Sequence, residues 1–331
     1  MSVEHAAPGN SQNQTVRVLK RRLRVPPILI AILLLFVMLI VFTIGNRNFF
    51  SMYNLGTITN YASILTVVAL GQMATILIGG IDLSVGGIVS LVSVVFVVSL
   101  KVIGYWAYPE VILLGALIGY VNGNILTRVK IPSFIATLGT GGILASLALL
   151  VAPTPTDVPS RAYKLLDITN GSTLGVSNVL IIGLLVLAVV YVILRFTRMG
   201  RNIYYVGSNI RMSWMSGIDI VKTRNFAYGI SGVGAAITGI MLSCAQFGGD
   251  PTVGTVYVLN SIAAVLVGGT ALTGGTGGPV NTLIGALMLS VLENGMNVVG
   301  VNVFFQQSIL GIMIIASVAL TFDRSKNAMI K

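Results

Sequence analysis

The sequence predicts an all-α, polytopic membrane protein with about ten transmembrane helices and both termini in the cytoplasm. Of its 331 residues, 55% are hydrophobic and 9% are charged, and the mean hydropathy is +0.93. A soluble domain carries about 25% charged residues, so this chain cannot cover a globule with polar surface. Apolar runs of about 20 residues, the length that spans a bilayer core, recur along the chain. The 38 glycines suit helices that pack closely in lipid.

The first apolar run follows a polar and basic N-terminal segment. Residues 1–25 are expected to form a largely disordered cytoplasmic tail. The run Pro26 to Ile44 is too long for a signal-peptide core and lacks a small-residue cleavage site, so we expect a retained first helix. The other predicted spans are 57–79, 84–101, 108–127, 132–151, 178–195, 224–246, 258–273, 279–298 and 304–322. The transmembrane domain is thus 26–323, with a cytoplasmic loop at 196–223 and a cytoplasmic tail at 324–331.

The distribution of basic residues tests this arrangement. With ten spans and cytoplasmic termini, 16 of the 20 Lys and Arg residues fall in cytoplasmic segments. The four on the outside are Arg47, Lys101, Arg161 and Lys164. A missed span would reverse every later segment, so the bias supports the even count. Topology therefore explains the net charge of +11, and no nucleic-acid partner is predicted.

Several kinds of chemistry are excluded by residue counts. The only histidine is His5 and the only cysteine is Cys244, so we predict no metal site, no disulfide and no histidine-based catalytic site. The glycine-rich stretch TALTGGTGGPV lacks the Lys-Ser/Thr of a P-loop, so the chain is not expected to bind ATP in that way. A membrane-bound transferase is disfavoured because no carboxylates are paired. We predict a protein that is not an enzyme.

Ionisable groups in the membrane are candidate functional residues because each is costly in lipid. Among the acids, only Asp82 and Glu293 fall in or against a predicted span. So few intramembrane acids argue that transport energy comes from outside the polypeptide. The alternative to a transporter with an external energy source is a self-contained secondary carrier for a small polar solute.

Each of these acids has two interpretations. Asp82 and Ser84 follow a Gly-Gly break, so one of them caps the next helix or lines a passage or gate. Whether the segment GGIDLSVGG is re-entrant stays open. Glu293 and Asn297 share a helix face, beside Asn294, and either line a passage or bond to a neighbouring helix, which we favour slightly.

Two stretches of the chain echo one another. ATILIGGIDLS at 74–84 and AVLVGGTALT at 264–273 both end an apolar run with Gly-Gly. The predicted topology places both on the cytoplasmic side. Internal duplication is common in transporters, but chance remains an equal explanation in so glycine-rich a chain.

Several segments together resemble the permease subunits of ribose/simple-sugar ABC importers. They are GQMATILIGGIDLSVGGIVSL, KIPSFIATLGT, RMGRNIYYVGSN, LNSIAAVLVGGTALTGGTGGPVNTLIGALML and LENGMNVVGV. The resemblance implies a bacterial inner-membrane subunit that forms the path for a pentose or hexose. It implies a second permease subunit, a periplasmic sugar-binding protein and a cytoplasmic ATPase with two nucleotide-binding cassettes. ATP and Mg would be bound by that ATPase, and no cofactor by this chain.

The resemblance also implies a cytoplasmic coupling helix that docks on the ATPase. The matching segment runs from 207 to 218 and contributes the residues Gly207, Ser208, Asn209, Arg211, Trp214, Met215, Gly217 and Ile218. It departs from the family because IRMSWM replaces the usual acidic residue and alanines. We still expect a short helix, capped by Asn209 or Ser208, with Trp214 or Met215 as an apolar anchor.

Because sugar specificity in this family lies largely in the binding protein, the path needs only weakly polar groups. The amides that would offer hydrogen bonds to sugar hydroxyls are Asn60, Gln72, Asn122, Asn260 and Asn294. Closure of the ATPase would reach them through the coupling helix as a movement of rigid helices.

Overall fold

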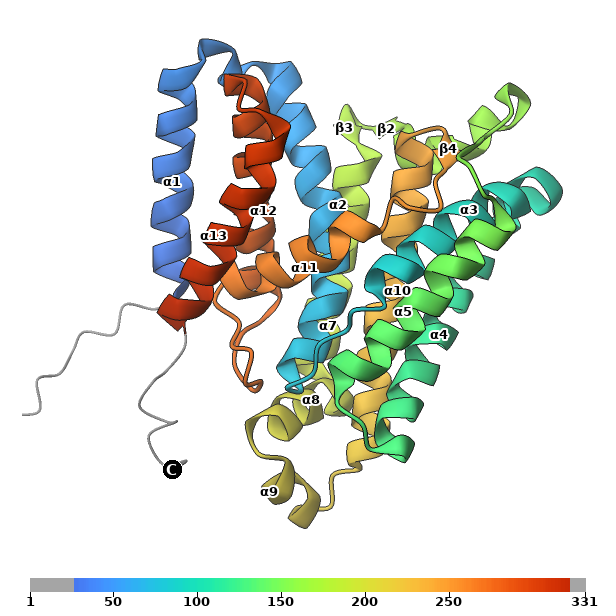
Figure 1. The fold of residues 1–331 in the computed structure, drawn as a ribbon, viewed down its shortest axis with the longest axis vertical. Helices are drawn as coiled ribbons and strands as arrows, with labels where there is room; N and C mark the ends of the chain where they lie inside the picture. The colour runs from blue at the N-terminus through green and yellow to red at the C-terminus, as the bar shows by residue number, and fades with distance from the viewer. Residues whose placement is uncertain (1–26, 322–331) are drawn as a thin grey trace, which may run out of the picture.

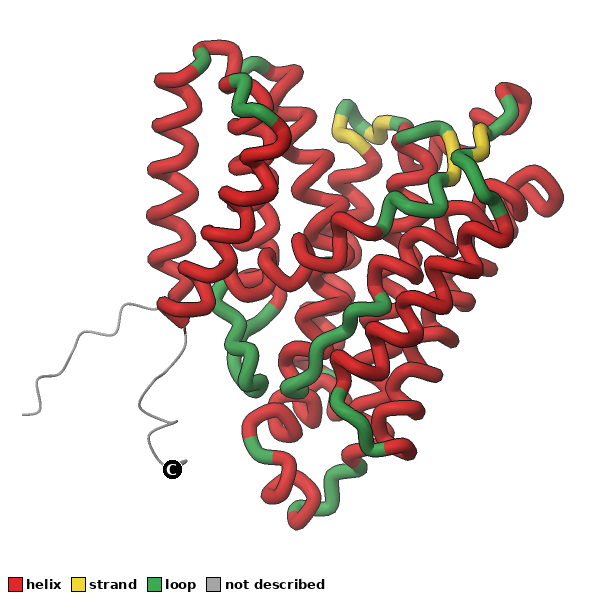
Figure 2. Tube along the Cα trace, viewed as in Figure 1, coloured by secondary structure: helices red, strands yellow, loops and turns green. Residues whose placement is uncertain are grey.

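The computed structural model describes residues 27–321, which are mostly helical (Figures 1 and 2). The longer helices are α1 (Pro27–Gly45), α2 (Met52–Leu77), α3 (Val85–Ile103), α4 (Ala107–Val129), α5 (Ser133–Val151), α7 (Asn178–Phe196), α8 (Arg198–Ser208), α10 (Ile220–Ala245), α11 (Thr255–Val267), α12 (Pro279–Val299) and α13 (Val303–Thr321). Shorter elements are η1 (Arg47–Phe50), η2 (Gly104–Trp106), η3 (Ser160–Leu166), α6 (Asp167–Asn170), α9 (Ile210–Met215) and the two-residue strands β1 (Thr156–Asp157), β2 (Ser172–Thr173), β3 (Val176–Ser177) and β4 (Gly248–Gly249).

The all-α class is confirmed, and each predicted span overlaps one of these helices. Seven helical stretches are long and apolar enough to cross a membrane, and one of them comprises both α3 and α4. The predicted tails at 1–25 and 324–331, with their basic residues, lie outside the described residues.

The predicted span 258–273 is too long. Helix α11 has 13 residues, or about 20 Å, which is less than the ~30 Å of a bilayer core. Figure 1 shows it lying across the other helices at mid-height. The Gly268-Gly269 pair ends the helix, and the chain continues as a loop to Gly278. Helix α2 ends early in the same way, at Leu77, where the sequence predicted 79.

The segment between α2 and α3 enters the bundle. In Figure 2 it climbs as a loop from the end near α8 before α3 begins. Asp82 and Ser84 in this segment are fully buried. The non-helical backbone is buried at Asp82 and Ser84, and residues 78–81 line a pocket. Such backbone is tolerated at membrane depth where it is buried in protein or lines a water-filled cavity.

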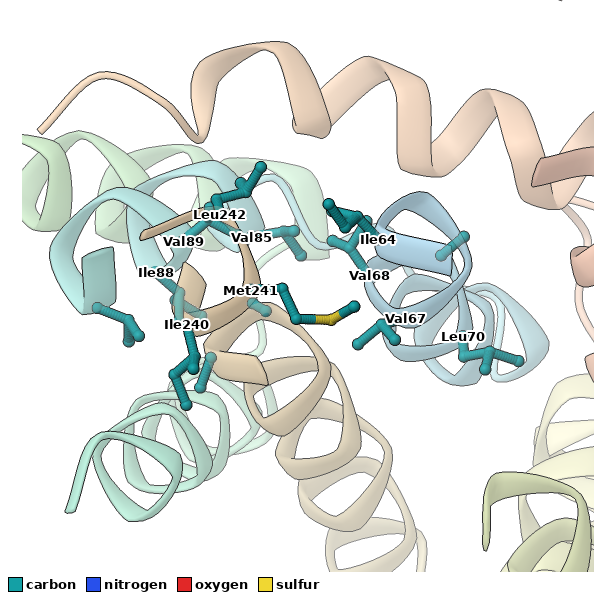
Figure 3. Close-up of a cluster of buried hydrophobic side chains, with 14 of the residues drawn as sticks. Ile64, Val67, Val68, Leu70, Val85, Ile88, Val89, Ile240, Met241 and Leu242 are labelled. Carbon is teal, nitrogen blue, oxygen red and sulfur yellow. The ribbon is translucent and has the colours of Figure 1, made fainter. Parts of the chain in front are cut away.

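The core lies where α2, α3 and α10 meet (Figure 3). Val67, Val68 and Leu70 of α2 are fully buried there, against Ile88 of α3 and Met241 of α10. These side chains have no contact with solvent, so the three helices form a fixed frame. The loops at either end of the bundle are positioned by this frame.

Helix α4 approaches α10 most closely through glycines. A Cβ on Gly115 would lie 2.5 Å from the carbonyl oxygen of Gly232 and 2.6 Å from Cβ of Ala236. A Cβ on Gly123 would lie 2.7 Å from Cα of Asn225. Spaced at every fourth residue, Gly115, Gly119 and Gly123 give α4 a flat face, which is how helices pack in membranes.

The two ends of the bundle differ. Helices α8 and α9 lie at the lower end in Figure 1, and the strands lie at the upper end. There β1 pairs with β4 and β2 with β3, within and beside the predicted outside segment 152–177. The start of α1 and the end of α13 lie close together, at the end of these helices that is nearer to α8. The described part of the chain therefore begins and ends on one side, and a cytoplasmic location for both termini stays a prediction.

Candidate functional site

The polar stretch between α7 and α10 folds into two short helices. Thr197 caps α8 by accepting a hydrogen bond from the amide of Gly200 (3.0 Å). Asn209 separates α8 from α9, and its Oδ1 accepts from the amide of Met212 (3.0 Å). The expected short helix is present, and its cap is Asn209 rather than Ser208.

Gly217 ends α9 in a left-handed turn. Its φ is +78°, its amide donates to the carbonyl of Trp214, and the amide of Ile218 donates to Ser213, both at 3.0 Å. This pair of bonds is the usual glycine-terminated helix end. Asp219 then caps α10 through the amide of Lys222 (2.9 Å). That bond holds the pKa of the Asp219 carboxyl below its ordinary value, so the cap is ionised at neutral pH.

The outer surface of α9 is apolar. Trp214 is 71% exposed and Met215 is 67% exposed, and Met212 and Ile210 are also exposed. Arg211 lies among them and is exposed as well. Large apolar side chains concentrated on a short polar connector mark a contact surface.

The inner side of α8 contacts the two glycine-rich loops, which follow α2 (78–84) and α11 (268–278). The amide of Gly275 donates to the carbonyl of Leu77 (2.9 Å), which joins the loop after α11 to the end of α2. Gly207 lies against this bond, since a Cβ on Gly207 would clash with the Leu77 oxygen and lie 2.6 Å from the Gly275 nitrogen. Gly207 therefore lies against the bundle, whereas Trp214 and Met215 lie on the exposed surface of α9.

The two echoing stretches have the same backbone turn. After α2, the amide of Gly79 donates to Ile76 and that of Gly80 to Thr75, both at 2.9 Å. After α11, the amide of Gly269 donates to Leu266 (2.9 Å) and that of Thr270 to Val265 (3.1 Å). Gly79 and Gly269 have φ values of +75° and +95°, which only glycine adopts easily. Both turns lie at the end that carries α8, as predicted.

Asp82 is the centre of a buried polar network. Its Oδ1 accepts from the amide of Ser84 (3.0 Å) and from the Ser84 hydroxyl. Its Oδ2 accepts from the hydroxyl of Ser231 on α10 (2.8 Å). Asn122 of α4 donates to the Ser84 oxygen (2.8 Å). The side-chain amide of Gln72 on α2 pairs with the backbone of Asp82, at 3.0 and 3.2 Å.

Four predicted path residues thus meet in one cluster: Gln72, Asp82, Ser84 and Asn122. The residue at the N-cap of α3 is Ser84, and its side chain caps no helix amide. Asp82 instead bonds to Ser84, so the expected helix cap is replaced by a loop clamp that joins α2, α4 and α10. Sequence reasoning missed Ser231, because a single serine 149 residues away in an apolar helix gives no signal.

We predict that Asp82→Ala destabilises the protein by about 3 kcal/mol, because the Ser84 and Ser231 donors lose a buried acceptor. Asp250→Ala is the matched control: Asp250 makes the same local bonds, to the amide and hydroxyl of Thr252, both at 2.7 Å. Within the described residues its carboxylate bonds only to Thr252, and the bond from its backbone amide to Ser93 of α3 survives the substitution, so we expect a loss of about 1 kcal/mol. Thermal unfolding in detergent measures both, and equal losses would contradict the clamp.

The other predicted path residues bond across helices. Asn260 of α11 donates to Glu293 of α12 (2.8 Å). The remaining contacts join Asn294 to Asn54 (2.9 Å), Asn297 to Gln306 (2.8 Å) and Asn60 to Ser177 (3.0 Å). Glu293 and Asn297 therefore reach different neighbours, α11 and α13. These contacts favour the packing interpretation of Glu293 and Asn297, and a lining role for these residues stays a prediction.

Known proteins are similar to this sequence over most of its length. A protein-family model, described as the permease component of branched-chain amino acid transport systems, matches residues 54–318. The chain belongs to this permease family. The match begins in α2 and ends in α13, so it covers both glycine loops, the Asp82 network and α9.

Individual relatives of the permease are named for sugars. It is 34% identical to the ribose import permease protein RbsC of Haemophilus influenzae over 86% of this chain and 90% of the relative. It is 35% identical to RbsC of Bacillus subtilis over 89% and 92%. It is 29% identical to the D-allose transport system permease protein AlsC of Escherichia coli over 84% and 86%. The resemblance to ribose/simple-sugar ABC permeases is thereby confirmed. No solved structure matches the permease significantly.

Proposed function

We propose that this permease forms the path for a monosaccharide, a pentose or a hexose, across the bacterial inner membrane. A cytoplasmic ATPase with two nucleotide-binding cassettes binds ATP and Mg and supplies the energy. A periplasmic binding protein delivers the sugar, and a second permease subunit completes the path. In this proposal the end that carries α8 and α9 faces the cytoplasm.

The observation that carries the proposal is the position of α9. Its exposed apolar side chains, Trp214 and Met215, suit a groove on a partner. Directly before it, Gly207 contacts Leu77 and Gly275 at the ends of the two glycine loops. A displacement of α9 by the ATPase would therefore be passed to the loops that enter the bundle.

The cargo is inferred from the relatives and from the hydrogen bonds that the two acids among the predicted path residues already accept. The family description names amino acids, but the relatives cited above are named for ribose and allose. An amino-acid path would need partners for an ammonium and a carboxylate. The only predicted path acids, Asp82 and Glu293, already accept hydrogen bonds from Ser231 and Asn260. Sugar hydroxyls fit a weakly polar path better.

The test is reconstitution in liposomes with a two-cassette ATPase and a sugar-binding protein from the same organism. We expect ATP-dependent uptake of ribose or allose that requires all three components. Uptake by the permease alone, driven by a proton or sodium gradient, would instead support the secondary carrier. ATP-dependent uptake of leucine and of neither sugar would overturn the proposed cargo while leaving the importer class intact.

A further inference from the structure

A pocket lies beside α8, next to the end of the loop that follows α11. It has a volume of about 440 Å³ and lies between the end of α7, α8 and the start of α12. Its lining includes Tyr191 and Arg195 of α7, and Arg201, Tyr204 and Tyr205 of α8. The Tyr204 hydroxyl donates to the carbonyl of Gly277 (3.3 Å), which closes the pocket toward the loop after α11.

The lining of this pocket is positively charged. It contains two arginines and no acidic side chain. Within residues 27–321 neither arginine pairs with a carboxylate, and the ion pair found there joins Lys222 to Asp219. Arg201 donates one bond, to the carbonyl of Phe196 (3.3 Å). Most guanidinium N–H groups in the pocket are thus available for an anion with several acceptor oxygens.

The first turn of α12 adds to this charge. Pro279, Val280 and Asn281 of this turn line the pocket, and the N-cap residue Gly278 has no side chain that could bond to the amides of Val280 and Asn281. The free amides of a first helical turn carry a partial positive charge and favour an anion. A phosphate group has several acceptor oxygens, so it can accept hydrogen bonds from two arginines and from such amides together.

The pocket also adjoins an exposed apolar surface that suits contact with lipid. Along α7, Leu184, Ala188, Tyr191 and Arg195 form one exposed stripe that leads from apolar residues to the pocket. Tyr191 is 43% exposed and Tyr205 is 55% exposed. Tyrosine with arginine at the end of a membrane span is typical of the headgroup level. A bound phosphate would therefore have room for acyl chains along this stripe.

We propose that this pocket binds the phosphate of an anionic phospholipid, whose headgroup lies against Arg195 and Arg201 and whose chains follow α7. The lipid would join α7, α8 and α12 at the base of the connector that leads to α9. None of the lining residues belongs to the Asp82 network, and the loop after α11 contributes only its last two residues, Gly277 and Gly278, to the lining.

The test uses the full chain, purified in detergent and delipidated, with added phosphatidylglycerol. The double variant Arg195→Gln/Arg201→Gln is expected to bind this lipid roughly thirtyfold more weakly than the unmodified protein, as measured by native mass spectrometry. Arg128→Gln/Lys130→Gln removes the same charge from exposed positions at the end of α4 and should bind as the unmodified protein does. Equal binding by all three proteins, or an equal loss in both variants, would overturn the proposal.

Two further arms separate a specific site from misfolding and from a soluble anion. Arg195→Lys/Arg201→Lys keeps the charge and should retain most of the binding, whereas a folding defect would remove it. Inorganic phosphate at millimolar concentration should raise the melting temperature less than phosphatidylglycerol does. If it raises the melting temperature as much, the site takes a free phosphate and the lipid assignment is wrong.

Discussion

Gly207→Ala is expected to abolish transport while the protein still enters the membrane and still recruits its ATPase. The added methyl group would meet the Leu77 carbonyl and the Gly275 amide, which are backbone atoms bonded to each other at 2.9 Å. Backbone cannot move aside as a flexible side chain does, so α8 must shift or the bond between the loops must break. Overpacking of this kind costs about 1–3 kcal/mol. Uptake in proteoliposomes, ATP hydrolysis and the melting temperature are the measurements.

The control for this change is Gly229→Ala in α10. Gly229 also lies inside a helix, but a Cβ there would meet nothing within 4 Å. The gain in helix propensity predicts a stability between unchanged and about 1 kcal/mol higher. If Gly207→Ala transports as well as Gly229→Ala does, the contact between α8 and the glycine loops does not carry the coupling.

The elements found from the sequence are those set by local pattern. Each of the ten apolar runs overlaps a helix, and the cap of α9, Asn209, is one of the two residues that the sequence offered. The shortened α11 was misjudged because apolar residues continue to Leu272 beyond the Gly268-Gly269 turn. A hydropathy average stays apolar across such a turn, so it does not show that the helix ends there.

The missing parts of the site depend on residues far apart in the chain. The bond from Ser231 to Asp82 spans 149 residues, and the contact of Gly207 with Leu77 and Gly275 brings together three separate segments. The spacing of apolar residues within one helix carries no information about contacts between such distant segments. The resemblance placed Gly207 and Trp214 in one coupling segment, although Gly207 lies against the bundle and Trp214 is exposed.

Trp214→Asp is expected to weaken binding of the ATPase by about 2–4 kcal/mol, the range of an aromatic anchor at an interface. Trp214 is 71% exposed at the surface of α9, so its loss should leave the fold and membrane insertion unchanged. Trp106→Asp is the matched control, because the chain has two tryptophans and Trp106, in η2 between α3 and α4, is 76% exposed. Recovery of the ATPase with the tagged permease measures the effect.

A second variant separates the shape of α9 from its side chains. Gly217→Val places a β-branched residue at a φ of +78°, where left-handed backbone costs about 1–2 kcal/mol. A Cβ at Gly217 would meet nothing within 4 Å, so the cost is conformational and not steric. The end of α9 should unwind, and ATPase recovery should fall although Trp214 and Met215 are both present. Full recovery with Trp214→Asp and with Gly217→Val together would remove α9 from the ATPase interface, and docking would then require a different surface.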